Sequence, residues 1–219
     1  TPAMTISSSV SVTSATAIIF NVAAHAQSLS VLLPQTWTAK TTISVDQSTE
    51  TTLCGATPVT PHFDVVADGA QTGLSGLSLG SVSACTGANA PTQVTFTSGD
   101  ITLSGALNVG LASLSLLQSA CLASGCTSGS LMCVGTSACT GSTSAVKPYY
   151  TLDDTELAQI TTSAVLLVGG PGCDQMNVSN VTLSESVSSV SPQQFNLVAA
   201  KTTSSSIQVN GASQLQFCS

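Results

Sequence analysis

The chain has 219 residues, of which only three are basic (all Lys) and ten are acidic, so its formal net charge is −7. Such a surface cannot neutralise a row of phosphates, which excludes nucleic acid as a partner. Hydrophobic residues make up 42% and the mean hydropathy is +0.41, which predicts a packed core rather than a disordered chain. No apolar run approaches the roughly 18 residues that a membrane-spanning helix needs, so we expect no membrane span.

The first 85 residues carry short strand patterns, as at Val10 and Val12, together with Trp37 and both histidines. They are compatible with a cap, with irregular first turns of a repeating fold, or with a small separate β-domain. No charged or Pro-rich linker follows them. We therefore expect a single domain over residues 1–219, with its beginning the hardest part to interpret.

Short alternating patterns dominate from Thr92 to Leu117, where two or three core residues are followed by a turn signal every few residues. Val94 with Phe96 and Ile101 with Leu103 are examples. Strands this short and this closely spaced do not suit an ordinary sandwich, whereas they are typical of the coils of a parallel β-helix. The sequence therefore predicts an all-β fold, a β-solenoid of short strands with a core of small aliphatic residues.

Residues 120–145 are rich in Ser, Gly and Cys and lack apolar periodicity, which predicts a disulfide-stapled loop insert. The whole chain has an even number of cysteines, and their pairing cannot be deduced from the sequence. Zinc binding is the competing interpretation, but the short Cys knuckles or His pairs that it needs are absent. We expect all of them to be paired in an oxidising, extracellular setting: Cys54, Cys85, Cys121, Cys126, Cys133, Cys139, Cys173 and Cys218.

A helical turn is predicted after Thr151, because Asp153 and Glu156 have the spacing of a capping box. Leu152, Leu157 and Ile160 can then lie on one face of a helical turn or two. Two adjacent glycosylation triplets follow, beginning at Asn177 and Asn180. These triplets agree with a secreted glycoprotein.

Four stretches carry a resemblance to a known family: "TFTSGDITLSGALNVGLASLSLL", "YTLDDTELAQITTSAVLLVGG", "MNVSNVTLSESVSSVSPQQFNLVAA" and "SSIQVNG". They resemble the rungs of filamentous-haemagglutinin-type adhesins over about residues 92–117 and 150–209. The resemblance implies a right-handed parallel β-helix and a surface or fibrous role. Two features depart from the family's pattern, namely the many cysteines and the insert between Cys121 and Cys139.

Some parallel β-helices are enzymes that process polysaccharides, and these enzymes need particular catalytic groups. Lyases of this shape need a strong base and an acidic calcium site, and glycosidases need converging carboxylates. The acidic pairs here have structural interpretations: Asp64 and Asp68 as strand ends, and Asp153 with Asp154 and Glu156 as a helix cap. We expect no catalytic residue, no cofactor and no metal.

The sequence around both histidines also favours structural roles for them. His62 alternates with Asp64 and could face the same side of a strand, although such a pair is more often a loop hydrogen bond. His25 has no carboxylate near it in the sequence.

The leading hypothesis is an extracellular structural glycoprotein that self-assembles, with copies of itself as partners, into a fibre or surface coat. The alternative is a surface adhesin that binds glycans through hydroxyl-rich faces, since Ser and Thr number 36 and 30; a polysaccharide-processing enzyme is a more distant third. Ice binding through Thr ladders is disfavoured, because only Thr95 and Thr97 show the Thr-x-Thr spacing within a clear strand.

The adjacent triplets lead to a prediction about sugar. We expect one N-linked glycan, on Asn180 with its Thr acceptor rather than on Asn177, together with O-linked sugar on exposed Ser and Thr. Peptide mass spectrometry of protein from its native source checks this. A bare peptide over both triplets, with no O-linked sugar elsewhere, would contradict it.

Overall fold

The computed structural model describes part of the chain. The backbone is described for residues 3–6, 11–14, 17–20, 27–33, 35–39, 42–45, 49–55, 62–67, 76–118, 131–135, 149–170, 173, 175–179, 181, 194–199 and 206–209. Side chains are described for residues 51–54, 77–118, 131–135, 150–170, 173, 175–179, 181 and 195–199.

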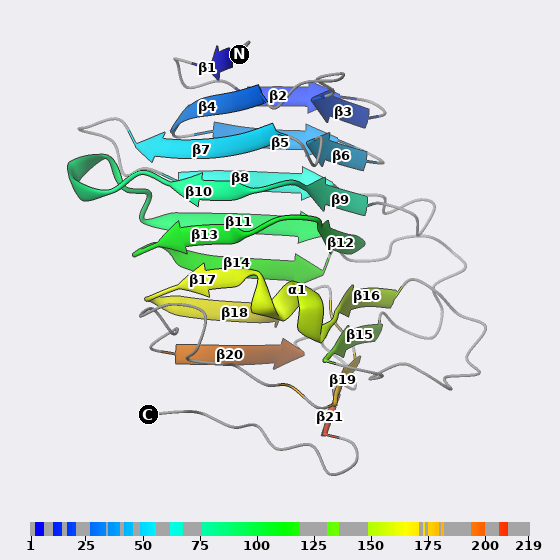
Figure 1. Ribbon diagram of the computed structural model, residues 1–219. Coiled ribbons are helices and arrows are strands. Elements are labelled where there is room, and N and C mark those ends of the chain that lie inside the picture. Colours follow the sequence, from blue (N-terminus) through cyan, green and yellow to red (C-terminus); the bar gives the residue numbers. More distant parts are fainter. Residues whose placement is uncertain are drawn as a thin grey trace.

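Four parallel sheets make up the described structure (Figure 1). The first sheet contains β1 (Ala3–Ile6), β4 (Gln27–Leu33), β7 (Thr49–Gly55), β10 (Val82–Ala84), β13 (Leu107–Gly110) and β17 (Ile160–Thr162). The second sheet contains β2 (Ser11–Ser14), β5 (Gln35–Ala39), β8 (His62–Ala67), β11 (Gln93–Ser98), β14 (Ser113–Gln118), β18 (Val165–Gly170) and β20 (Gln194–Ala199).

The other two sheets have four strands each. The third sheet contains β3 (Ala17–Phe20), β6 (Thr42–Val45), β9 (Gly76–Leu79) and β12 (Asp100–Leu103). The fourth sheet contains, in spatial order, β16 (Tyr149–Leu152), β15 (Leu131–Val134), β19 (Gln175–Val178) and β21 (Ser206–Val209). A short 3-10 turn η1 (Gly87–Asn89) and a helix α1 (Asp154–Ala158) complete the described elements.

The strand order shows how the chain travels. Up to β14, each strand pairs with the strand three places later, so the chain visits the first, second and third sheets in turn and then returns to the first. Strands from residues 1–85 belong to the same sheets as later ones; β8, for example, pairs with β11. The expectation of an all-β fold is confirmed.

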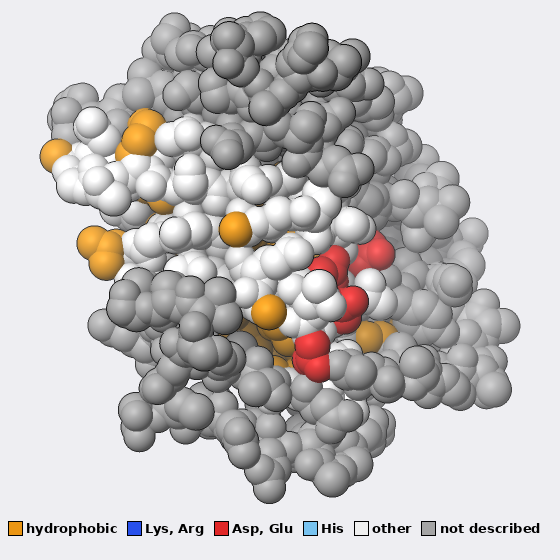
Figure 2. Space-filling view, in the orientation of Figure 1, with side chains coloured by type: hydrophobic (Ala, Val, Ile, Leu, Met, Phe, Trp, Pro, Cys, Tyr) orange, Lys and Arg blue, Asp and Glu red, His pale blue; other side chains and the backbone are white. Residues whose placement is uncertain are grey.

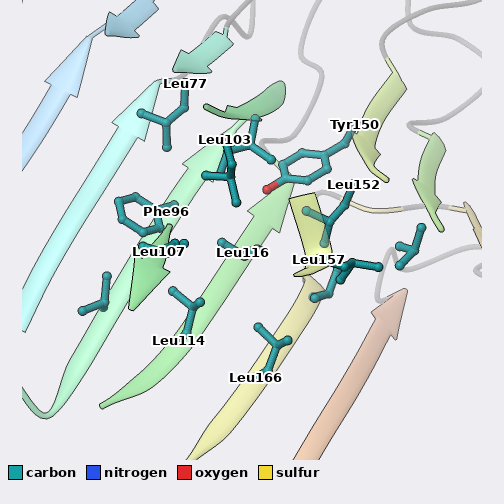
Figure 3. Close-up of a cluster of buried hydrophobic side chains, with 14 of the residues drawn as sticks. Leu77, Phe96, Leu103, Leu107, Leu114, Leu116, Tyr150, Leu152, Leu157 and Leu166 are labelled. Carbon is teal, nitrogen blue, oxygen red and sulfur yellow. The ribbon is translucent and has the colours of Figure 1, made fainter. Parts of the chain in front are cut away.

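Parallel pairing in register stacks like residues above one another inside the sheets. In the second sheet, Val94 is level with Leu114 and Leu166, and Phe96 is level with Leu116. All five side chains are buried, and they face the core together with those of the first and third sheets (Figure 3). Residues between them on each strand, such as Thr95, lie on the outer face and are half-exposed.

Side-chain hydroxyls hold the corners between sheets. Ser104 follows β12 and donates from both its backbone N–H and its hydroxyl to the Leu79 carbonyl of the preceding coil (both 2.9 Å). Ser163 makes the same pair of bonds to Gly110, at 2.9 and 3.0 Å. These bonds continue the inter-strand ladder where the strands end, which is a structural use for part of the chain's many hydroxyls.

The segment 120–145 differs from the predicted loop, because it contains the strand β15. Its residues Leu131-Met132-Cys133-Val134 show no alternation of polar and apolar types, which hid the strand from a pattern search. Met132 and Val134 are fully buried in the core, and Cys133 is almost fully buried as well. A strand buried on both faces reads as a continuous apolar run.

The stacked core leads to a stability prediction. Leu116→Ala should lower the free energy of unfolding by about 2–5 kcal/mol, because it leaves a cavity between Phe96 and Val168. Its matched control, Ser115→Ala, changes a half-exposed neighbour on the outer face and should stay within about 0.5 kcal/mol of the parent. Urea unfolding followed by circular dichroism measures both. Equal effects of the two substitutions would contradict the stacked core.

Candidate functional site: the acidic junction

All acidic side chains that the structure describes gather at one place, where β12 of the third sheet packs beside β16 of the fourth (Figure 2). We call this group the acidic junction; it consists of Asp100, Asp153, Asp154 and Glu156. Asp100 begins β12, and the other three belong to α1 and its N-cap. The junction is the most concentrated charge among the described residues.

Asp100 links the two sheets through its carboxylate. Its Oδ1 accepts hydrogen bonds from the backbone N–H of Thr151 (2.8 Å) and from the Thr151 hydroxyl (3.1 Å). Thr151 belongs to β16, so the carboxylate takes the place of a strand-to-strand backbone bond where the third and fourth sheets meet.

Glu156 makes a second link and closes the helix cap. Its Oε2 accepts from the backbone N–H of Asp153 (3.1 Å), and the Asp153 carboxylate accepts from the backbone N–H of Glu156 (2.9 Å). The predicted capping box is therefore confirmed. Glu156 Oε1 also accepts from the backbone N–H of Leu103 in β12 (3.2 Å), which the sequence did not indicate.

Burial raises the pKa values of two carboxyl groups of the acidic junction. It raises the pKa of Asp100 above its ordinary 3.8, against hydrogen bonds from Thr151 that lower it. Burial also raises the pKa of Glu156 above its ordinary 4.5, and the nearby charges of Asp153 and Asp100 add to the increase. Tyr150 is fully buried next to them, and burial raises its pKa well above 10.0.

The carboxylates of the acidic junction act as structural hydrogen-bond acceptors that join neighbouring elements. The carboxylates of Asp100, Asp153 and Glu156 each accept backbone N–H groups, as a structural cap does. No set of three His, Cys, Asp or Glu side chains within the described residues is arranged to hold a metal ion. The helix-cap interpretation of Asp153 and Glu156 thus has direct geometric support.

The other candidate acids and histidines lie elsewhere. His62 and Asp64 both belong to β8, where they lie two places apart. The prediction that Asp64 marks a strand end is wrong, because β8 begins at His62 and continues to Ala67. His25 and Asp68 lie outside the described residues.

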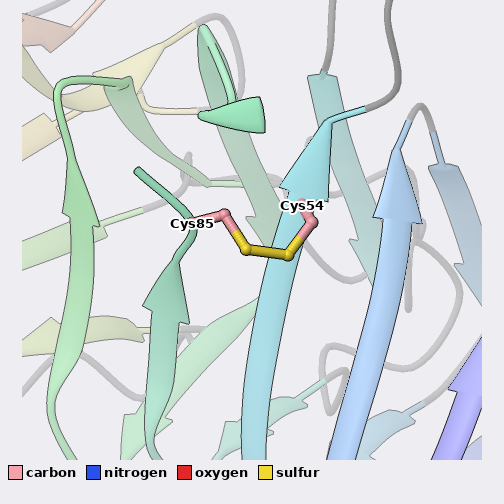
Figure 4. The surroundings of a disulfide bond; sticks show 2 residues. All are labelled: Cys54 and Cys85. Atoms are coloured by element: carbon pink, nitrogen blue, oxygen red, sulfur yellow. A yellow bond between two sulfur atoms is a disulfide. The ribbon is translucent and has the colours of Figure 1, made fainter. Parts of the chain in front are cut away.

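One disulfide is fully described. Cys54 and Cys85, whose Cα atoms are 5.0 Å apart, join the ends of neighbouring strands β7 and β10 in the first sheet (Figure 4). Cys133 is also disulfide-bonded, to a partner outside the described residues. Cys173 is buried, and its sulfur donates a hydrogen bond to the Gln175 carbonyl (3.2 Å). The remaining four predicted positions are outside the described residues: Cys121, Cys126, Cys139 and Cys218.

The two glycosylation candidates are placed differently. Asn177 lies within β19, level with Cys133 of β15, and is half-exposed. Asn180 lies just beyond this strand and outside the described residues. Modification of either asparagine stays a prediction.

Columns of mostly Ser and Thr positions run across the sheets; the sequence indicated hydroxyl-rich faces but not which residues align. One column crosses the whole first sheet and contains five hydroxyl residues and one amide, at register positions Thr5, Ser30, Thr52, Ser83, Asn108 and Thr161. In the second sheet, Thr36 and Thr38 of β5 occupy the same two columns as Thr95 and Thr97 of β11. The Thr-x-Thr spacing at residues 36–38 was a usable signal for the second pair.

In comparisons with known proteins, no protein-family model, curated protein or solved structure matches the chain. Among the described residues, none of the helices has the length and apolar character needed to cross a membrane.

The raised pKa values of Asp100 and Glu156 set a direction for stability against pH. The folded state binds the protons of these two carboxyl groups more tightly than the unfolded state does. Their contribution to the free energy of unfolding is therefore complete below about pH 4 and is lost as the pH rises through the raised pKa values. Asp100→Asn should flatten this decline, because an amide oxygen still accepts from Thr151 and the group no longer titrates. Urea unfolding at a series of pH values between about 4 and 7 measures the effect. An unchanged slope in the variant would contradict the assignment.

Proposed function

We propose that this chain is an extracellular structural protein, a right-handed parallel β-helix that self-assembles into a fibre or surface coat. The observation that carries the proposal is the strand order: up to β14, three sheets are visited in turn, and each strand from β4 onward pairs with the one three places earlier. A solenoid built this way needs either caps or further copies at its ends, because its last strands have unpaired backbone groups.

The ends of the sheets support assembly between copies. Within the described residues, β2 pairs only with β5 at one edge of the second sheet, and β20 pairs only with β18 at the other. Both edges belong to one parallel sheet, so β20 of one copy can pair with β2 of the next in the same sense. Such a contact joins unlike surfaces and propagates as a filament when it does not close into a ring.

Charge gives little opposition to this contact. Soluble monomers commonly block edge pairing with lysine or proline, and this chain has three lysines in 219 residues. The net charge of −7 is screened beyond about 8 Å at physiological salt. Close stacking through hydroxyls, backbone and aliphatic groups therefore meets weak repulsion.

Disulfides and the resemblance to filamentous-haemagglutinin-type adhesins support the extracellular, fibrous role. The bond between Cys54 and Cys85 fits an oxidising compartment. The junction carboxylates have structural partners, so the proposal assigns no catalytic residue.

Glycan binding by an adhesin is the second candidate, and the hydroxyl columns favour it. Column positions in neighbouring strands repeat at about 4.8 Å, which presents a regular array of hydroxyls on the face of the first sheet. A glycan-binding monomer would use such an array without forming filaments.

Light scattering and electron microscopy test the assembly. We expect particles much larger than a single chain at low salt and equally at about 1 M salt, because the contacts are not ionic. Val198→Lys, which puts a charge on the edge strand β20, should abolish the filaments. Its matched control, Leu117→Lys, lies in the same outer column but in the inner strand β14, and should leave them intact.

A monodisperse single chain under all of these conditions would overturn the proposal. Glycan-array binding by that single chain would then establish the adhesin.

A further inference from the structure

One strand stands out of chain order. The fourth sheet runs β16, β15, β19, β21, so β15 precedes β16 in the chain yet lies between β16 and β19 in space. Strands in the first, second and third sheets follow their chain order without exception among the described residues. After β14 the chain therefore passes the position of β16, forms β15, and then returns to form β16.

The slot that β15 fills is one strand wide. Leu131 of β15 is level with Tyr149 of β16 and with Gln175 of β19, and the three following residues keep the same register on both sides. Because the register does not shift, β16 and β19 present matching edges to a single four-residue strand.

Filling this slot completes the core. Met132 lies between Tyr150 and Met176, and all three side chains are fully buried. The backbone at the end of β15 is hydrogen-bonded to both neighbouring strands. The N–H of Gly135 donates to the Leu152 carbonyl (2.8 Å), and the N–H of Ser179 donates to the Val134 carbonyl (2.9 Å).

The end of β15 fits tightly as well. Gly135 has a φ of +94°, and a Cβ at this position would overlap the carbonyl oxygen of Ser179. The close approach of the two backbones therefore requires glycine at the end of the strand that fills the slot.

Long connections lead into and out of the strand. Residues 119–130 separate β14 from β15, and residues 135–148 separate β15 from β16, which makes 12 and 14 residues respectively. At about 3.3 Å per residue, 12 residues span up to roughly 40 Å. This reach exceeds the spacing of neighbouring strands, about 4.8 Å, several times over.

We propose that β15 is exchanged between copies, so that β15 of one chain fills the slot between β16 and β19 of a second copy. The proposal rests on the self-assembly proposed above and specifies its mechanism. An exchanged strand keeps every contact that it makes within one chain, so exchange loses no packing and depends on concentration. The connections are long enough to reach a second copy, and the strand Leu131–Val134 carries no charged residue.

An introduced disulfide tests the exchange. Leu131→Cys with Gln175→Cys places two thiols at level positions of β15 and β19, on half-exposed and exposed sites. If β15 is exchanged, the new bond joins two chains, and a non-reducing gel shows covalent dimers and larger species. The matched control is Thr95→Cys with Ser115→Cys, level positions of β11 and β14, which join strands in chain order and should give single chains.

Isotopes give an independent readout. Assembly from mixed normal and 15N-labelled chains of the test variant should yield joined peptides that carry one label of each kind. Where this variant folds poorly by circular dichroism, Leu131→Cys with Tyr149→Cys reports on the other edge of the slot with the same readout.

The outcomes separate the two proposals. Large particles whose introduced bond stays within single chains would overturn strand exchange and leave assembly standing. Single chains by both scattering and gel would overturn both. Interchain bonds in the control pair to the same extent as in the test pair would also overturn the exchange, because the native cysteines would then explain them.

Discussion

The parallel, in-register backbone pairing between strands of successive coils is the interaction on which the rest of the structure depends. It places Val94, Leu114 and Leu166 above one another and so converts short alternating patterns into continuous aliphatic columns. Each strand of three to seven residues is too short to be stable alone, and it gains its core only from the coils above and below it. The same pairing aligns the outer residues, so the hydroxyl columns are a direct consequence of the register.

The acidic junction shows what happens where this pairing is interrupted. Asp100 and Glu156 accept backbone N–H groups from Thr151 and Leu103 at the meeting of the third and fourth sheets. A half-buried carboxylate carries a desolvation cost, which is why the pKa values of both groups are raised. The charge-assisted hydrogen bonds offset this cost and spare the buried backbone from being left without partners. The charged side chains that the structure describes are thus concentrated where the ladder changes sheets.

The interrupted ladder and the displaced strand occur in one region of the molecule. The regular strand order ends at β14. Beyond it, β16 packs beside β12, and β15, which comes earlier in the chain than β16, lies on the other side of β16. The excursion that contains β15 also contains Cys121, Cys126, Cys133 and Cys139. One of these cysteines, Cys133, therefore lies within the strand that we propose to be exchanged.

The sequence by itself determined the all-β class, the strands at residues 93–98 and 113–118 and the capping box of α1, because period-two alternation and cap spacing are local properties. Only the tertiary structure decided the register, which brings Thr36 and Thr38 into the columns of Thr95 and Thr97, and the pairing of Cys54 with Cys85. It also revealed β15, because burial on both faces removes the alternation that marks a strand. Register, cysteine pairing and strand order all join residues far apart in the chain, and no local pattern carries that information.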